Sequence, residues 1–269
     1  MKPFARELAI APGSKIRLAK IDPEDTHGVE KSKADHHLKS NLERLSVLQY
    51  LLYAEGKRAL LVVLQGIDAG GKDGTIRHVM SGLNPQGVVV TPFKVPEGAE
   101  KRHDYLWRVH NAVPEQGSIG IFNRSHYEDV LVVRVHDLVP KPVWQKRYGQ
   151  INDFERMLSE NGVRIVKFLL YISKDEQAKR FRERIDDPSK NWKFSPADIK
   201  EREYWDQYIE AYQDMLEKCS TEWAPWYVIP ANHKWFRNLA VSEIVRQTLE
   251  SMDLKFPKPT AGLAGVKFE

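Results

Sequence analysis

The chain has 269 residues, of which 42% are hydrophobic and 29% are charged, and its formal net charge is only +4. This length fits one α/β domain with an insertion or two small domains, and the hydrophobic content suffices for a substantial core. The single cysteine, Cys219, excludes an intrachain disulfide framework, and no stretch approaches the roughly 20 apolar residues that a membrane span needs. We therefore expect a cytoplasmic protein with no signal peptide and no membrane partner.

Residues 1–35 mix charged residues, proline and glycine without clear periodicity, and we interpret them as an arm that crosses the surface. The pattern becomes helical from Ala34. Leucines then follow at three- and four-residue spacing, which places one apolar stripe against a core: Leu38, Leu42, Leu45, Leu48 and Leu52.

Short apolar, β-branched runs along the chain predict strands that are buried on both faces of a parallel sheet. These runs lie at 59–64, 88–90, 118–122, 163–172 and 226–229. Helical patterns separate them, at 74–82, 100–112, 142–161, 175–185 and 234–252. The alternation predicts a three-layer α/β fold, in which helices cover both faces of a central, mostly parallel sheet.

One segment breaks this alternation. Residues 186–197 lie between two predicted helices and contain Pro188 and Pro196. Long non-periodic loops inside compact domains are often lids or binding loops, so we interpret the segment as the tip of a mobile helical lid at 180–205. A plain surface loop is the alternative. The chain is thus divided into an arm (1–35), a domain that contains the lid (36–252) and a tail (253–269).

A glycine-rich loop follows the first predicted strand and leads into a helix. Its sequence is Gly66-Ile-Asp-Ala-Gly-Gly-Lys72-Asp-Gly-Thr75, which matches the first part of the P-loop pattern. Such loops turn backbone N–H groups towards phosphate oxygens, and the helix N-terminus adds partial positive charge. Lys72 is predicted to neutralise terminal phosphates as a point charge. The other residues expected to bind phosphate here are Gly66, Ala69, Gly70, Gly71, Asp73, Gly74 and Thr75.

The loop departs from the pattern in its polar residues. Asp73 stands where the pattern has the Ser or Thr that holds Mg²⁺, and Thr75 lies two residues further on. Asp68 is unusual inside a cradle for anions, because its charge repels phosphate unless a divalent cation lies between them. We therefore expect Asp68 to bind Mg²⁺ or to face the incoming nucleophile. The alternative is a glycine-rich turn without a chemical role.

Polar residues also follow the strand predicted at 118–122. Asn123 occupies the position at which P-loop enzymes carry a metal-binding carboxylate, and its amide cannot serve as a base. Arg124 is well placed to clamp phosphate. Glu128 and Asp129 bring carboxylates one turn later, where the alternative is a solvated helix start.

Basic residues gather beyond other strand ends and in the predicted lid. Ligands of open α/β sheets bind at the carboxyl ends of the strands, and a set of cations converging there favours a polyanion much longer than one nucleotide. A solvated helix face is the alternative for any single member. The candidates for phosphate binding are Lys94, Arg102, Arg134, Arg180 and Arg184, and the lid tip adds Lys190 and Lys193.

Together these segments resemble the polyphosphate kinase 2 family. The resemblance rests on 66–74, on Phe122-Asn-Arg-Ser-His-Tyr127, and on Arg180-Phe-Arg-Glu-Arg184 with the Lys190-Asn-Trp-Lys193 tip, and it extends from about Asp35 to Met252. It implies a P-loop kinase fold of the thymidylate-kinase-like type with a helical lid. It further implies Mg²⁺ or Mn²⁺ as cofactor, inorganic polyphosphate with AMP, ADP and ATP as substrates, and a homodimer or homotetramer.

By this resemblance the family's loop aspartate corresponds to Asp68, its lysine to Lys72 and its second-strand arginine to Arg124. Asn123 replaces the family's usual second-strand aspartate, which shifts the expected metal binding to Asp68. Glu128, the second expected metal ligand, is similar to the variant in members that accept both AMP and ADP.

We therefore predict a phosphotransferase that moves phosphate from polyphosphate to AMP and ADP. Its predicted catalytic residues are Asp68, Lys72, Arg124 and Glu128. An ATP-dependent nucleoside monophosphate kinase would share the fold but would need fewer basic residues. A nucleic-acid-binding module with a degenerate P-loop would show no turnover, and the intact Lys72 with Asp68 disfavours it, so we expect no nucleic-acid partner.

Overall fold

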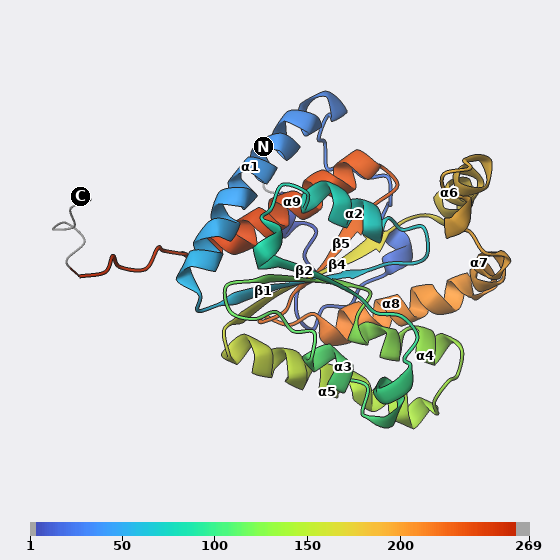
Figure 1. The fold of residues 1–269 in the computed structure, drawn as a ribbon. Helices are drawn as coiled ribbons and strands as arrows, with labels where there is room; N and C mark the ends of the chain where they lie inside the picture. Colours follow the sequence, from blue (N-terminus) through green and yellow to red (C-terminus); the bar gives the residue numbers. More distant parts are fainter. Residues whose placement is uncertain (1–3, 262–269) are drawn as a thin grey trace.

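A five-stranded parallel sheet forms the centre of the protein in the computed structural model, which describes residues 4–261 (Figure 1). The strands are β1 (Ala59–Gln65), β2 (Val88–Pro92), β3 (Ile119–Asn123), β4 (Val163–Tyr171) and β5 (Trp226–Pro230). Their order is β2-β3-β1-β4-β5, and every neighbouring pair is parallel. The strands lie where the apolar runs predict them, and the predicted α/β sheet is confirmed.

Helices cover both faces of this sheet. They are α1 (Lys31–Glu55), α2 (Lys72–Val79), α3 (Trp107–His110), α4 (Val132–Val135), α5 (Lys141–Glu160), α6 (Lys174–Asp186), α7 (Pro196–Glu201), α8 (Trp205–Cys219) and α9 (Lys234–Ser251). Short 3₁₀ helices are η1 (Phe4–Arg6), η2 (Leu18–Lys20), η3 (Pro85–Gly87), η4 (Gly98–Arg102), η5 (His126–Val130), η6 (Asn191–Lys193) and η7 (Arg202–Tyr204). Helices α1, α2 and α9 lie on one side of the sheet, and α3, α4, α5 and α8 lie on the other (Figure 1).

The central strand β1 is buried along its whole length, which explains the unbroken apolar run at 59–64. Side chains of a strand alternate between its faces, so Leu60 and Val62 join the core under α1 and α9, whereas Leu61 and Val63 join the core under α5 and α8. The leucine stripe of α1 packs into the first of these cores. Because the strands are parallel, the loops after β1, β3, β4 and β5 meet at one edge of the sheet.

The helix predicted over 100–112 is wrong as a continuous element. The structure has η4, a break and the short α3 in its place. His103 is extended (φ −116°, ψ 170°), and the carboxylate of Asp104 accepts a hydrogen bond from the backbone N–H of Leu106 (2.9 Å). An aspartate that bonds the backbone two residues on stabilises a turn at the expense of the helix.

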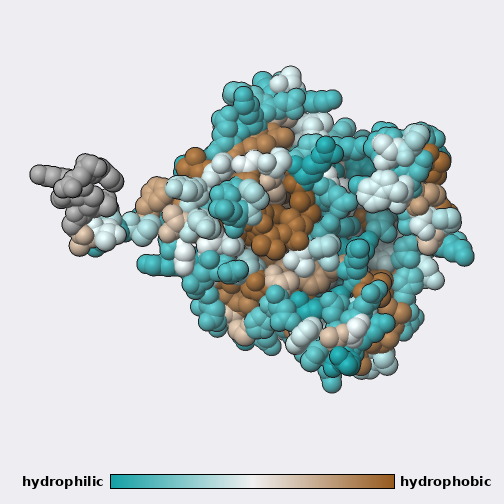
Figure 2. Space-filling model, viewed as in Figure 1, coloured by the Kyte–Doolittle hydropathy of each residue, from teal (hydrophilic) through white to brown (hydrophobic). Residues whose placement is uncertain are grey.

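The two edges of the sheet differ. The N-terminal arm runs along β5, where Val228 N donates to Leu8 O and Ile10 N donates to Trp226 O, both at 2.9 Å. At the other edge, Val89 and Val90 of β2 are 53% and 43% exposed. Figure 2 shows hydrophobic surface in the middle of this face of the molecule, among hydrophilic side chains.

Elements α6, η6, α7 and η7 form a projection beyond the carboxyl end of β4, which we call the lid segment (174–204) (Figure 1). Helices α6 and α7 flank a stretch that contains the 3₁₀ helix η6. The lid expected at 180–205, with its mobility, stays a prediction. Across residues 4–261, no helix combines the length and the apolar character that a membrane crossing requires.

Candidate active site

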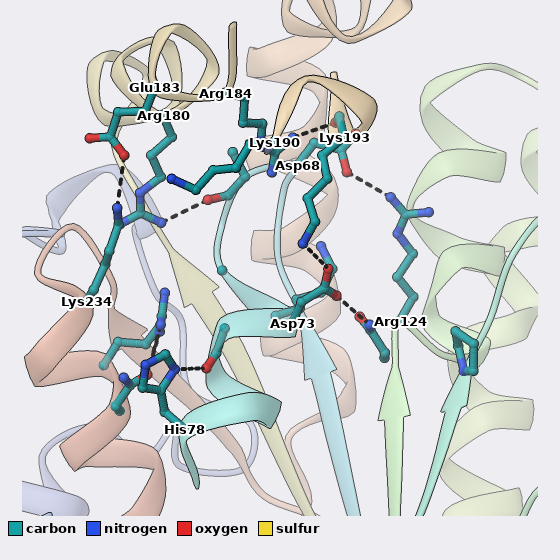
Figure 3. Close-up of a pocket in the computed structure, with 18 of the residues that line it drawn as sticks. Asp68, Asp73, His78, Arg124, Arg180, Glu183, Arg184, Lys190, Lys193 and Lys234 are labelled. Carbon is teal, nitrogen blue, oxygen red and sulfur yellow. Dashed lines mark hydrogen bonds and ion pairs between the residues drawn. The ribbon is translucent and has the colours of Figure 1, made fainter. Parts of the chain in front are cut away.

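The loop from β1 to α2, which we call the P-loop (66–75), opens into a cavity of about 850 Å³ (Figure 3). The walls of this cavity come from the P-loop, the carboxyl end of β3, the lid segment and the start of α9. We call it the main cavity. Many of the residues predicted from sequence line it: Asp68, Ala69, Gly71, Lys72, Asp73, Gly74, Lys94, Asn123, Arg124, Arg180, Arg184, Lys190 and Lys193.

Lys72 begins α2 and is only 9% exposed. Its Nζ donates to the carbonyl oxygen of Gly66 at 2.6 Å, across the P-loop. Burial lowers the pKa of Lys72, and the positive charge of Arg124 lowers it further. Thr75 Oγ1 donates to Gly71 O at 3.2 Å, within the first turn of the helix. The lysine is thus held where the phosphates of a ligand would lie.

Arg124 follows β3 and has a left-handed backbone conformation (φ 62°), which is uncommon for a residue with a side chain. Its backbone N–H donates to Leu64 O of the neighbouring strand β1, and its Nη2 donates to Asp68 Oδ1 at 2.8 Å (Figure 3). Burial alone would raise the pKa of Asp68, but Lys72 and Arg124 outweigh it and lower the pKa. Asp68 is therefore ionised at neutral pH between two cations.

Asp73 connects the P-loop to two other parts of the site. Its Oδ1 accepts from the amide of Asn123 (2.8 Å), and its Oδ2 lies 3.7 Å from Lys193 Nζ of the lid segment (Figure 3). The residue that departs from the P-loop pattern thus contacts both the end of β3 and the lid tip.

A second cavity of about 240 Å³ lies on the other side of Arg124, and we call it the side cavity. Asp68 and Glu128 line it, together with Tyr208 and Tyr212 of α8. Burial raises the pKa of Glu128, although Arg124 and other cations oppose this. Glu128 is half-buried within η5, so it does not simply begin a solvated helix. The structure therefore brings the two expected metal ligands to one cavity.

The lid segment also closes one wall of the side cavity. Glu201 Oε1 accepts from Tyr208 Oη (2.5 Å) and lies 2.8 Å from His136 Nε2, so α7 contacts both α8 and the end of α4. Asp198 of α7 lines the same cavity.

Arg180 lines the main cavity, but its guanidinium is engaged by the protein. Nη1 donates to the carbonyl oxygens of Ala69 (2.9 Å) and Gly70 (3.2 Å) in the P-loop. Nη2 donates to the carbonyl oxygens of 231–232 at 2.5 and 3.0 Å, in the loop after β5, and Nε donates to Glu176 (2.8 Å). Arg180 therefore joins the lid segment to two loops of the sheet edge.

Two of the predicted basic residues are not brought to the main cavity. Arg134 donates to Asp214 Oδ2 (2.7 Å) and lies over the ring of Trp144, because α4 directs it towards α5 and α8. Arg102 is exposed at the end of η4 and is not among the residues that line this cavity.

A buried ion pair supports the loop that carries Arg124 and Glu128, and the sequence analysis missed it. Lys167 of β4 donates to Glu155 Oε2 (2.5 Å), Tyr127 Oη (2.7 Å) and Cys219 O (2.8 Å). Glu155 Oε1 also lies 3.1 Å from His126 Nε2. Burial alone would raise the pKa of Glu155, but Lys167 and His126 lower it. A lysine inside the otherwise apolar run 165–170 was the available signal in the sequence.

The start of α9 contributes further residues that the sequence analysis did not single out: Lys234, Trp235 and Arg237. Their position in the sequence could have indicated them, because they follow β5 and the carboxyl end of β5 lies at the same edge of the sheet as the P-loop.

A phosphate loop with its lysine, beside a cavity rich in cations on an open parallel sheet, defines a phosphotransferase of the P-loop kinase class. A family model described as Polyphosphate kinase 2 (PPK2) matches residues 28–257. The chain belongs to the polyphosphate kinase 2 family, and the resemblance inferred from its sequence is confirmed.

Similar proteins cover nearly the whole chain. An AMP/ADP-polyphosphate phosphotransferase of Meiothermus ruber is 54% identical, over 94% of this chain and 96% of that protein. An ADP-polyphosphate phosphotransferase of Rhodopseudomonas palustris is 47% identical, over 97% of this chain and 94% of that protein. The crystal structure of Polyphosphate Kinase 2 from Arthrobacter aurescens TC1 superposes with a TM-score of 0.94 at 45% identity, covering 97% of this chain and 94% of that one.

Proposed function

We propose that this protein transfers phosphate from inorganic polyphosphate to AMP and ADP, giving ADP and ATP. The observation that carries the proposal is the charge of the main cavity. Nine lysines and arginines line it against four aspartates and glutamates, an excess of five, whereas the whole chain has a formal net charge of +4. Such a concentration of cations suits a polyanion that continues beyond one nucleotide. The names of the similar proteins from M. ruber and R. palustris support the same donor.

Phosphoryl transfer requires in-line positioning and charge neutralisation more than covalent chemistry. Lys72 lies at the P-loop and Arg124 at the end of β3, so the two cations approach the transferred group from different strands. When the donor binds, Lys72 Nζ would exchange its bond to Gly66 O for phosphate oxygens. The nucleophile is a nucleotide phosphate oxygen that is already ionised at neutral pH, so the reaction needs no general base, and the amide of Asn123 would not provide one.

The acceptor nucleotide is proposed to enter from the side cavity, because that cavity meets the main cavity at Asp68 and Arg124. The tyrosines of α8 offer aromatic surface there. AMP and ADP would place their terminal phosphates at different depths in the side cavity. Glu128 lines this cavity, so we expect its carboxylate to affect binding of the two acceptors differently.

Asp68 and Glu128 are the residues proposed to hold Mg²⁺. Among residues 4–261, no group of three His, Cys, Asp or Glu side chains could hold a metal ion alone. Two carboxylates in one cavity nevertheless fit Mg²⁺, since this ion keeps several waters and binds one or two carboxylates plus substrate phosphates. When bound, the ion would neutralise charge on the phosphates.

The proposal is tested by mixing the protein with Mg²⁺, long-chain polyphosphate and either ADP or AMP, and by measuring the products by chromatography. We expect ATP from ADP, and ADP followed by ATP from AMP, with no nucleoside triphosphate present. The Lys72→Ala protein is the matched control for contaminating kinases. Phosphorylation that occurs only with a nucleoside triphosphate as donor would refute the proposal.

A further inference from the structure

Arg237, in the first turn of α9, is a buried cation, and no carboxylate of the described residues forms an ion pair with it. The residue is only 3% exposed, and across residues 4–261 the one side-chain acceptor for its guanidinium is the neighbouring amide of Asn238, at 2.8 Å from Nη2 and 3.2 Å from Nε. Two other buried cations have carboxylate partners, Lys167 with Glu155 and Arg180 with Glu176, whereas Lys72 donates to the carbonyl oxygen of Gly66. Arg237 lacks an anion of this kind.

The guanidinium of Arg237 lies directly against the P-loop. A Cβ atom added to Gly71 would lie 1.9 Å from Arg237 Nη1, and one added to Gly74 would lie 3.2 Å from Nη2. Gly71 also has a φ of 105°, which favours glycine for conformational reasons. The two glycines therefore leave the space that the guanidinium fills, and Arg237 reaches the main cavity through it.

Burying a charge without a partner costs free energy, and residues 4–261 supply no carboxylate that pairs with Arg237. Burial lowers the pKa of Arg237 to about 10, and the nearby charge of Arg180 contributes to the decrease. Arg237 still carries its charge at neutral pH. Nη1 makes no hydrogen bond to the protein within the described residues, so it has N–H groups available to a ligand in the main cavity.

We propose that Arg237 binds a phosphate group of the donor, next to the P-loop and on the side of α9, and so selects a donor that continues as a phosphate chain. A nucleoside triphosphate ends its phosphates in a sugar and a base, whereas polyphosphate places another anion beside the guanidinium. The planar fork of arginine suits two oxygens of one phosphate. This inference rests on the proposed function, and it adds the residue that supplies donor specificity.

The test is isothermal titration calorimetry of inorganic tripolyphosphate into the nucleotide-free protein at fixed salt concentration. Arg237→Met should weaken tripolyphosphate binding by roughly tenfold or more, because a charged donor is lost from the binding site. Arg156→Met, an exposed substitution on α5 outside the site, is the control and should bind as the wild type does. Without ligand, Arg237→Met should unfold at the same temperature as the wild type or higher, because it removes an unpaired buried charge.

Unchanged tripolyphosphate affinity in Arg237→Met would overturn the inference, provided that the wild type binds the probe. A wild type that binds no tripolyphosphate and makes no ATP from polyphosphate would instead overturn the proposed function. If Arg237→Met fails to fold, the tripolyphosphate titration is repeated with Arg237→Lys. An ammonium group cannot form the fork, so affinity reduced at least about threefold supports the inference and wild-type affinity overturns it.

Discussion

Replacing Arg180 with methionine should destabilise the protein where the lid segment meets the sheet edge. Methionine keeps much of the apolar stem but makes none of the hydrogen bonds to the P-loop, to 231–232 or to Glu176. A hydrogen bond from a charged donor contributes about 1.5–3 kcal/mol, but these bonds share one guanidinium and do not add independently. Removing one member of a buried ionic group costs about 3–5 kcal/mol, and the Arg180 side chain is only 6% exposed. We therefore expect the free energy of unfolding to fall by about 3–5 kcal/mol.

Urea unfolding followed by tryptophan fluorescence measures this loss, and the chain has seven tryptophans as probes. Arg182→Met is the matched control, since Arg182 is exposed on the same helix and makes no side-chain hydrogen bond or ion pair in the structure as described. The control should change the free energy of unfolding by less than about 0.5 kcal/mol. A loss below about 1 kcal/mol in Arg180→Met would refute the view that this guanidinium holds the loops together.

Three further substitutions test the site. Lys72→Ala should lower kcat by roughly a hundredfold, because it removes a charge aimed at the transferred group, and a fully active variant would contradict the P-loop assignment. Glu128→Asn should lower kcat/KM for AMP more than for ADP; an unchanged ratio would mean that Glu128 does not set the acceptor range. Burial raises the pKa of Asp129 to about 6 despite its ion pair with Arg147, so between pH 4 and 6 the native state binds more protons than the unfolded chain. As pH rises through this range, the free energy of unfolding of the wild type should therefore fall by up to about 3 kcal/mol relative to that of Asp129→Asn. Urea unfolding of both proteins across this pH range measures the difference, and parallel pH profiles would contradict the prediction.

The sheet and the P-loop could be predicted because their signals are local. Strand β1 is buried on both faces, so residues 59–64 are all apolar, and the loop after it carries its glycines and lysine at fixed spacing. The parallel arrangement then implies that Arg124 and Glu128, which follow another strand, approach the same sheet edge.

The sequence does not show which basic side chains bind other parts of the protein and which remain available to a ligand, because their partners lie far away along the chain. Arg134 pairs with Asp214, and Arg180 contacts carbonyl groups in two loops, yet both resemble free cations in the sequence. Arg237 shows the reverse case. Its sequence surroundings resemble an ordinary helix start, and only the folded chain places it against Gly71 without an anion.

The contact between the arm and β5 has a consequence for the order in which the protein is built. Leu8 is synthesised long before Val228, whose backbone N–H donates to its carbonyl oxygen. During synthesis the arm therefore cannot form these hydrogen bonds until β5, the last strand of the sheet in the sequence, has left the ribosome. Pairings between such distant segments form slowly, and an exposed strand edge can pair with another chain in the meantime. The unpaired edge of β5 therefore exposes the newly made protein to aggregation until residues 8–10 lie beside 226–228.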